Sequence, residues 1–223
     1  MKRFITIIAS IFIAFSFTKT VLADGHQVYG PYPITLKGYD GDATNSVKYT
    51  GQMARHALHD SLKALVKSGD VAKMMAYYNG EDGLAIVAPA SKGDFVIKQT
   101  MVSEIGSGNL SGKMYKGYIP GWGNLTGPEA LEHMITKAGE VEGGFDPNTG
   151  MDYTQLISKF AMGAVFYNQA VNSYLGSKME IGQKPNSEPY KEGAYYTGKE
   201  HSWDEAFGYW GSAAHALTLS AEQ

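Results

Sequence analysis

The feature that most constrains the fold is the stretch DYTQLISKFAMGAVFYNQAVNSYLG, which spans residues 152–176. Asp152 is a favourable N-cap residue, Gln155 stands three positions later as in a capping box, and Gly176 is a typical residue for ending a helix. The apolar residues cover most of the helix circumference instead of one narrow stripe. We therefore predict a long helix at the centre of a helical bundle, and we expect a neighbouring element to approach closely at Gly163.

Shorter patterns predict further helices. Apolar residues recur at helical spacing between residues 50 and 69, a short helix is expected over 71–78, and Pro128 at a first helical position predicts a helix through about Lys137. Glycines interrupt every candidate element in residues 79–127, and residues 24–47 are rich in turn-forming residues. The sequence thus predicts an all-α helical bundle with long glycine-rich loops and an extended N-terminal arm.

The first residues predict export. Lys2 and Arg3 precede an apolar run, and the small-residue site that ends at Ala23 is typical of a cleavable signal peptide. The apolar run is shorter than the ~20 residues that a membrane span requires. We expect cleavage after Ala23, a periplasmic or secreted location, no transmembrane segment after cleavage, and a single helical domain over residues 24–223.

Composition excludes several classes of function. The chain has 19 basic and 22 acidic residues, a net charge of −3, and loss of the predicted leader would leave 16 basic residues and a charge of −6. Scattered lysines in an acidic chain argue against a nucleic-acid partner. The chain has no cysteine, so disulfides, thiolate metal sites and thiol nucleophiles are excluded.

The stretch KEHSWDEAFGYWG, residues 199–211, concentrates the polar chemistry. If the helix already includes His201, then His201, Asp204 and Glu205 lie on one face and could bind a divalent metal or iron. If instead Ser202 and Glu205 form a capping box, His201 lies just outside the helix and the acids only favour its positive end. The aromatic residues of this stretch are expected in the core or in a pocket wall under both interpretations.

A second histidine group occurs in the sequence RHALHD, residues 55–60. His56, His59 and Asp60 share a predicted helix face and could be ligands. We favour a solvated polar face for these three residues.

Three sequence blocks carry a resemblance to a known family. They are SVKYTGQMARHAL at 46–58, KFAMGAVFYNQAVNSYL at 159–175 and EHSWDEAFGYWG at 200–211. With these blocks the chain resembles the DUF4856 family of exported bacterial proteins of unknown function. Relative to that family we expect the chain to be shortened at its C-terminus. A more distant resemblance, through His201-x-x-Asp204, is to imelysin-like proteins, which are exported helical bundles linked to iron acquisition.

The resemblance implies an all-α exported protein and marks polar positions from three helices that could converge in the bundle interior. The implied ligand-binding residues are Gln52, Arg55, Tyr167, Gln169 and Trp203, and the implied metal ligands are His201, Asp204 and Glu205. The cofactor is unknown, with a divalent metal or iron as the candidate.

Three functional hypotheses follow. The first is a periplasmic helical-bundle protein that binds iron, a related metal, its complex or another small ligand, with no catalysis. The second is a metal-dependent, peptidase-like hydrolase in which Glu205 acts as base toward a metal-bound water. The third is a non-catalytic interaction module at the cell envelope. The sequence does not fix the ligand, the reaction or the oligomeric state.

Overall fold

The computed structural model describes residues 34–43, 46–87 and 99–211. The predicted signal peptide and the first part of the predicted arm lie outside these ranges. Within them the chain forms five α-helices, a π-helix and one two-stranded hairpin. The elements are α1 (Thr50–Leu65), α2 (Val71–Asn79), α3 (Gly127–Gly139), β1 (Phe145–Asp146), β2 (Met151–Asp152), α4 (Tyr153–Ala161), the π-helix (Met162–Tyr174) and α5 (Gly198–Trp210). The predicted all-α class is confirmed.

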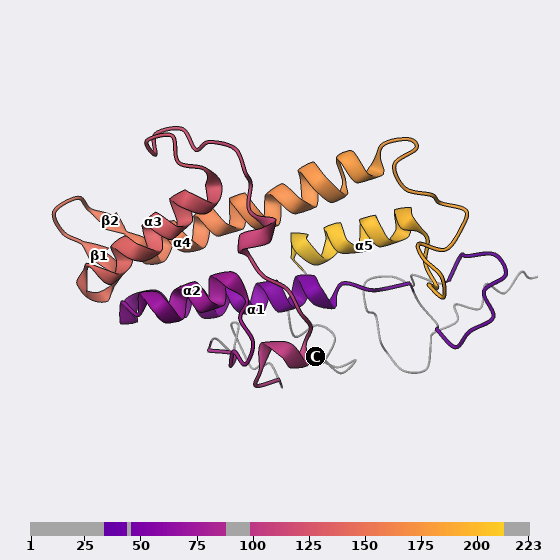
Figure 1. The fold of residues 1–223 in the computed structure, drawn as a ribbon, viewed down its shortest axis with the longest axis horizontal. Helices are drawn as coiled ribbons and strands as arrows, with labels where there is room; N and C mark the ends of the chain where they lie inside the picture. The colour runs from indigo at the N-terminus through magenta and orange to yellow at the C-terminus, as the bar shows by residue number, and fades with distance from the viewer. Residues whose placement is uncertain (1–33, 44–45, 88–98, 212–223) are drawn as a thin grey trace, which may run out of the picture.

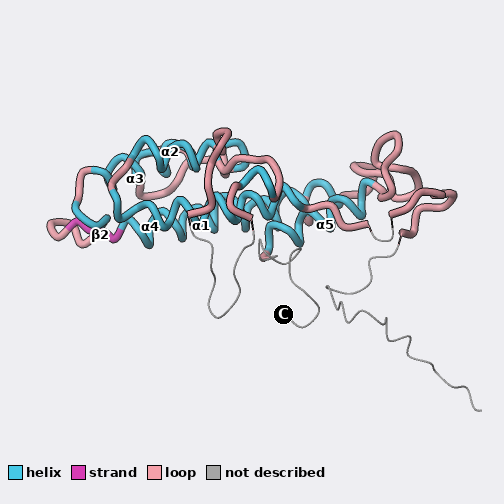
Figure 2. The backbone as a smooth tube through the Cα atoms, turned by 90° about the horizontal axis from the view of Figure 1, so that it is seen from below, coloured by secondary structure: helices cyan, strands magenta, loops and turns pink. Residues whose placement is uncertain are grey.

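The helices form two layers. Figure 1 shows α4 and the π-helix as one continuous rod along the upper edge, with α1 along the lower edge and α5 between them in the right half. Figure 2 shows α2 and α3 in a second layer that covers the α1 and α4 half. As a result, α3 packs on the first half of the rod and α5 packs on the second half.

Local sequence explains where the helices begin. Thr126 and Glu129 form a capping box at the start of α3, with proline in its first turn. The Asp152 side chain accepts a hydrogen bond from the Gln155 amide at 3.2 Å and caps α4. Each of these helices begins within one or two residues of its predicted start.

The long predicted helix is present, but its second half is a π-helix instead of an α-helix. Residues 162–174 form a π-helix that continues α4 without a break, and the Leu175 amide after it donates to the Ala170 carbonyl at 2.9 Å, five residues back. The expected close approach at Gly163 is wrong. No atom of another element lies within 4 Å of where its Cβ would be, because this position faces solvent.

The apolar core is richest where α2, α3 and α4 meet. Leu131, Ile135 and Ile157 are fully buried there, together with Met74 from α2 and Leu62 from α1. Their burial provides the main driving force for folding this half of the molecule.

The segment between α2 and α3 has no α-helix in its described part. Residues 102–104 and 111–113 form two short 3₁₀ turns, and two isolated bridges pair Ala85 with Met101 and Tyr118 with Thr126. The segment is held to the helices instead, since the Tyr115 amide donates to the Ala164 carbonyl at 2.7 Å.

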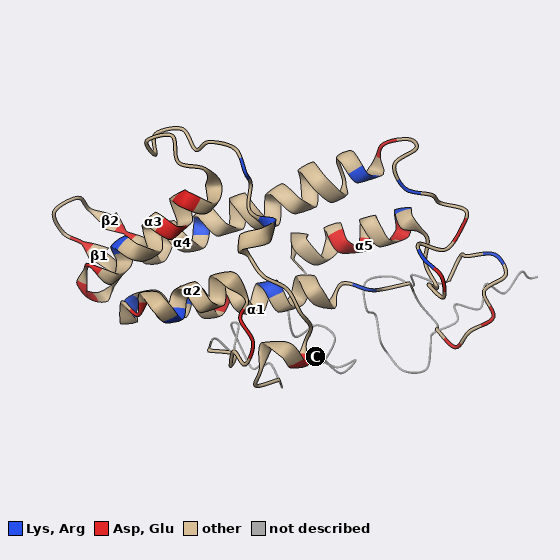
Figure 3. Ribbon diagram, viewed as in Figure 1, with Lys and Arg blue, Asp and Glu red and all other residues tan. Residues whose placement is uncertain are grey.

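Basic and acidic side chains are interspersed over the described chain. Figure 3 shows no continuous stripe of Lys and Arg on the ribbon. Within the ranges above, no helix is both long enough and apolar enough to span a bilayer.

Candidate functional site

Helix α5 begins one turn earlier than a Ser202 cap would require. Thr197 and Glu200 form a reciprocal capping box, in which the Thr197 amide donates to Glu200 at 2.7 Å and the Glu200 amide donates to the Thr197 hydroxyl at 3.2 Å. Ser202 lies inside the helix and is buried. The interpretation that places His201 within the helix is confirmed, and the Ser202 capping box is wrong.

The N-terminal arm reaches the same end of the molecule. The Thr35 hydroxyl donates to the Glu200 carboxylate at 2.5 Å, and Figure 1 shows the described arm residues next to the start of α5. The described arm therefore supports the beginning of α5.

Glu205 lies at the centre of a polar cluster between α1, α5 and the end of the π-helix. The Gln52 side-chain amide on α1 donates to one Glu205 oxygen at 2.8 Å. The other Glu205 oxygen lies 3.5 Å from His201 Nε2, one turn back on α5. Because Gln52 is buried and Glu205 is 19% exposed, the cluster is buried on one side and open to solvent on the other.

Asp204 does not join this cluster. Its side chain is buried and accepts a hydrogen bond from the Lys48 backbone amide at 2.5 Å. Burial raises the pKa of Asp204 to about 7, against the lowering effect of the Lys48 hydrogen bond. The predicted ligand trio is thus divided, and the described residues contain no group of three or more His, Asp or Glu side chains placed to hold a metal ion.

Tyrosines enclose the imidazole of His201. Its ring lies 4.8 Å from the ring of Tyr196 in a stacked arrangement and 4.7 Å from that of Tyr190. Burial lowers the pKa of His201, and the Glu205 charge opposes this effect. His201 Nδ1 is buried without a hydrogen-bond partner in the described structure, so a polar atom at the edge of the cluster is unsatisfied.

Three cationic side chains lie in the neighbourhood of Glu205, and none of them forms an ion pair with it among the described residues. Burial lowers the pKa of both Lys113 and Lys178, while the Glu205 carboxylate raises both. Arg55 also lowers the pKa of Lys113, and its own Nε donates to the Asn109 carbonyl at 2.9 Å. Three cations therefore lie near one carboxylate, and the local charge is positive.

Tyr174 and Tyr209 complete the cluster. Lys178 Nζ lies 3.4 Å from the centre of the Tyr174 ring, and the Arg55 guanidinium lies 5.7 Å from that of Tyr209. Burial raises the pKa of Tyr174, and the Glu205 charge adds to this rise. No sequence pattern marked three of these residues as part of a site, because each stands alone in a loop or at the end of a helix: Lys113, Lys178 and Tyr174.

The other predicted ligand-binding residues lie outside the cluster. The Gln169 amide donates to the Lys113 backbone carbonyl at 2.9 Å and so holds the loop to the π-helix. Tyr167 and Trp203 are 56% and 52% exposed. The expectation that the aromatic residues of 199–211 form a core or pocket wall holds for Tyr209 but is wrong for Trp203.

The histidines of α1 are not on a solvated face. His59 is buried, with Nε2 3.1 Å from the Ser158 carbonyl and Nδ1 3.0 Å from the Asp60 carboxylate. His56 Nε2 lies 2.9 Å from the Gly208 carbonyl, which fixes this nitrogen as the donor. The sequence-based prediction of a solvated face is wrong for the two histidines, because their rings connect α1 to α4 and α5. It is confirmed for Asp60, whose side chain is 58% exposed.

Ser158, His59 and Asp60 are arranged in the order of a nucleophile triad, but their geometry does not fit that role. Ser158 Oγ is 3.4 Å from His59 Nε2, and the same nitrogen lies closer to the Ser158 carbonyl. Ser158 is also buried. A triad histidine needs a free Nε2 lone pair directed at an accessible hydroxyl, so this group is a structural link between α1 and α4.

The fold and the cluster define a helical bundle with a polar, partly open site at one end. The profile of a family described as "Domain of unknown function (DUF4856)" matches residues 130–222. This part, which includes α4, the π-helix and α5, is similar to the DUF4856 family, so the predicted resemblance is confirmed over these residues. Residues 46–58, which carry Gln52 and Arg55, precede the matched range. No curated protein and no solved structure matches the chain significantly, and the resemblance to imelysin-like proteins stays a prediction.

Proposed function

We propose that the protein is an exported, non-catalytic binding protein of the cell envelope, whose site for a small anionic ligand is the cluster around Glu205. The observation that carries this proposal is the excess of cationic groups. Arg55, Lys113 and Lys178 come from three separate segments, Arg55 and Lys178 lie over the Tyr209 and Tyr174 rings, and the Glu205 charge acts on both lysines. An anion would offset the burial of these cations, which is what lowers the pKa of both lysines.

The hydrogen-bonding groups support the same ligand chemistry. Lys113 and Lys178 carry donors only, and Tyr174 adds a hydroxyl. Glu205 is held by Gln52, so it would orient the cationic side chains and accept from any donor of the ligand. A small acid that also carries a hydroxyl or amine group satisfies both kinds of partner.

A metal cation fits the same residues less well. His201 and Glu205 are two potential ligands, and Asp204 is held away by the Lys48 amide. The neighbouring lysines would repel a divalent ion. The hydrolase hypothesis depends on such an ion, so we do not extend the proposal to hydrolysis.

The proposal is tested by ligand retention. The exported chain is incubated with a small-molecule extract of the producing cells, repurified and denatured, and the released compounds are identified by mass spectrometry. We expect the wild type to retain an acidic compound and Lys178→Gln to lose it. The control variant Glu188→Gln, which changes an exposed residue outside the cluster, should retain it as the wild type does. Retention that does not change in Lys178→Gln, or no retained acid, would contradict the proposal.

Calorimetric titration with iron and zinc separates the metal hypothesis from ours. We expect no tight site. Stoichiometric binding that disappears in His201→Ala would instead support the metal hypothesis. N-terminal sequencing of the exported chain checks the location, with Asp24 as the expected first residue.

A further inference from the structure

A cleft shares Tyr209 with the Glu205 cluster. It has a volume of about 350 Å³ and opens between α1, the α4–π-helix rod and the end of α5. Its lining includes His56, His59, Met162, Phe166, Tyr209 and Trp210. This volume is at the small end of the ~300–1,000 Å³ that ligand sites occupy.

The inner wall of the cleft is a rigid aromatic surface. Phe166 stacks on His56 with ring centres 4.3 Å apart and meets Tyr209 edge to face at 6.2 Å. Phe166 and Tyr209 are buried, and the hydrogen bond from His56 to the Gly208 carbonyl fixes the imidazole plane. Preformed flat walls of this kind favour a planar guest, since neither wall has to reorganise on binding.

The outer part of the cleft has exposed aromatic side chains. Trp210 and Tyr167 line it and are 68% and 56% exposed. Covering large aromatic surfaces with a guest removes them from water, which favours binding.

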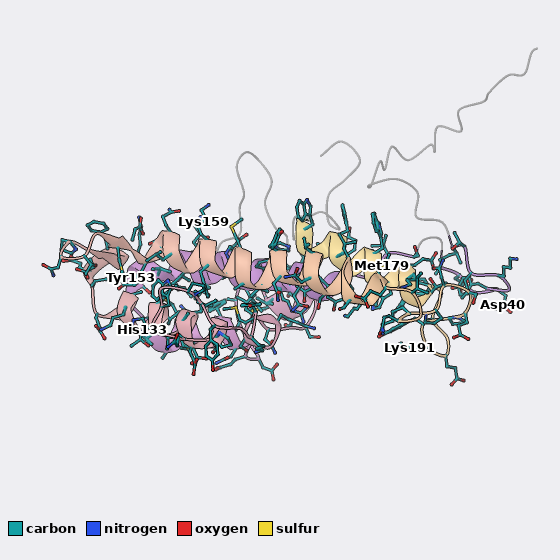
Figure 4. All side chains as sticks on the ribbon, turned by 90° about the horizontal axis from the view of Figure 1, so that it is seen from above. Asp40, His133, Tyr153, Lys159, Met179 and Lys191 are labelled. Carbon is teal, nitrogen blue, oxygen red and sulfur yellow. The ribbon has the colours of Figure 1, made fainter. Side chains whose placement is uncertain are left out.

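The charge available at the cleft is positive. Lys63 of α1 and Lys159 of α4 line it, and neither forms an ion pair with another described residue. The Asp60 carboxylate is already bonded to His59 Nδ1. Figure 4 shows Lys159 on the outer face of α4, away from His133 on the opposite side of the molecule. An acidic group on a guest would therefore meet two lysines and one carboxylate, that of Asp60, which is already bonded to His59 through one oxygen.

We infer that this cleft is a second ligand site, specific for a small planar aromatic carboxylate. The aromatic ring of the guest packs against the accessible rings of His56, Tyr167 and Trp210, in front of the buried Phe166 and Tyr209. Its carboxylate pairs with Lys63 and Lys159. The inference does not depend on the Glu205 cluster, because the cationic groups at the two places are different.

The inference is tested by calorimetric titration of the full exported chain with benzoate, which lacks the hydroxyl or amine group expected of a ligand at the Glu205 cluster, and with benzamide, which has the same shape as benzoate without the charge. We expect one saturable site per chain for the acid and binding of the amide weaker by about tenfold. In NMR spectra, the imidazole signals of His56 should shift on addition of the acid, whereas those of His133 should not.

Matched variants locate the site. Lys159→Gln should weaken binding of the acid by about fivefold and leave binding of the amide unchanged. Lys67→Gln, on an exposed turn beyond α1, and Lys178→Gln, in the Glu205 cluster, should leave both affinities unchanged. Phe166→Leu should weaken both probes. Equal affinities for acid and amide, or equal effects of Lys159→Gln and Lys67→Gln, would overturn the inference, and so would the absence of saturable binding. Failure here leaves the ligand-retention result at Lys178 unaffected.

Discussion

The two halves of the bundle bury different kinds of side chain. Where α3 covers α4 and α2, the buried residues are mainly apolar, as in Leu131 and Ile157, and one buried hydroxyl, that of Tyr78, has no hydrogen-bond partner among the described residues. Where α5 covers the π-helix and α1, the buried set includes Gln52 and Asp204, and both the Tyr209 hydroxyl and His201 Nδ1 have no such partner. Buried polar groups reduce stability unless they are paired, so we expect the α3 half to contribute more to stability, and the α5 half contains the proposed binding site.

The largest expected effect is in the α3 half. Leu131 is fully buried, so Leu131→Ala should reduce the free energy of unfolding by about 2–5 kcal/mol through lost burial and the cavity left behind. Tyr209→Phe in the α5 half should change it by less than about 1 kcal/mol, because the hydroxyl that it removes is buried and unpaired. Urea denaturation of both variants measures the difference, and equal losses would contradict the contrast between the halves.

The next effect depends on pH and concerns Asp204. Burial raises its pKa in the folded state from 3.8 to about 7, so the folded protein binds a proton more tightly than the unfolded chain does. The stability from this group is complete below pH 3.8 and is lost as the pH rises to about 7. Relative to the wild type, Asp204→Asn should gain about 3 kcal/mol in free energy of unfolding between pH 4.5 and pH 8.

Denaturation at a series of pH values checks the Asp204 prediction. Asp82→Asn, at an exposed turn, is the matched control. A difference between the wild type and Asp204→Asn that stays constant with pH would show that this carboxyl does not titrate as its burial requires.

The smallest effect compares two helical glycines, Gly208 in α5 and Gly163 in the π-helix. A Cβ at Gly208 would lie 2.7 Å from Tyr49 Cβ and 2.9 Å from Gln52 Cβ, so Gly208→Ala should lower the free energy of unfolding by about 1–2 kcal/mol. A Cβ at Gly163 would have no neighbour within 4 Å, so Gly163→Ala should raise that free energy by about 0.5–1 kcal/mol. Thermal melting of both variants gives the signs, and a stabilising Gly208→Ala would show that α1 and α5 do not pack this closely.

Local sequence predicted the helices because their determinants are local. The capping residues Thr126 and Asp152 stand next to the segments that they start, and the helical spacing of apolar residues is visible within each segment. The π-helix could not be predicted, since its wider winding depends on packing against α5.

The site was predicted only in part, for a related reason. Helix α5 packs its small residues, Ala206 and Gly208, inward and leaves Trp203 and Trp210 exposed, which is the reverse of what hydrophobicity predicts. Which residues of α5 face inward depends on how closely α1 approaches α5. That distance is a property of the assembled fold. The cationic groups came from isolated lysines such as Lys113, which no sequence pattern distinguished.

The hydrogen bond between Gln52 and Glu205 joins positions 153 residues apart, and the one between the Lys48 amide and Asp204 joins positions 156 apart. Helices α1 to α4 precede α5 along the chain, so they can pack together before α5 joins them. We therefore expect the Glu205 cluster to form late in folding, and a chain that lacks α5 to have an apolar core without the proposed binding site.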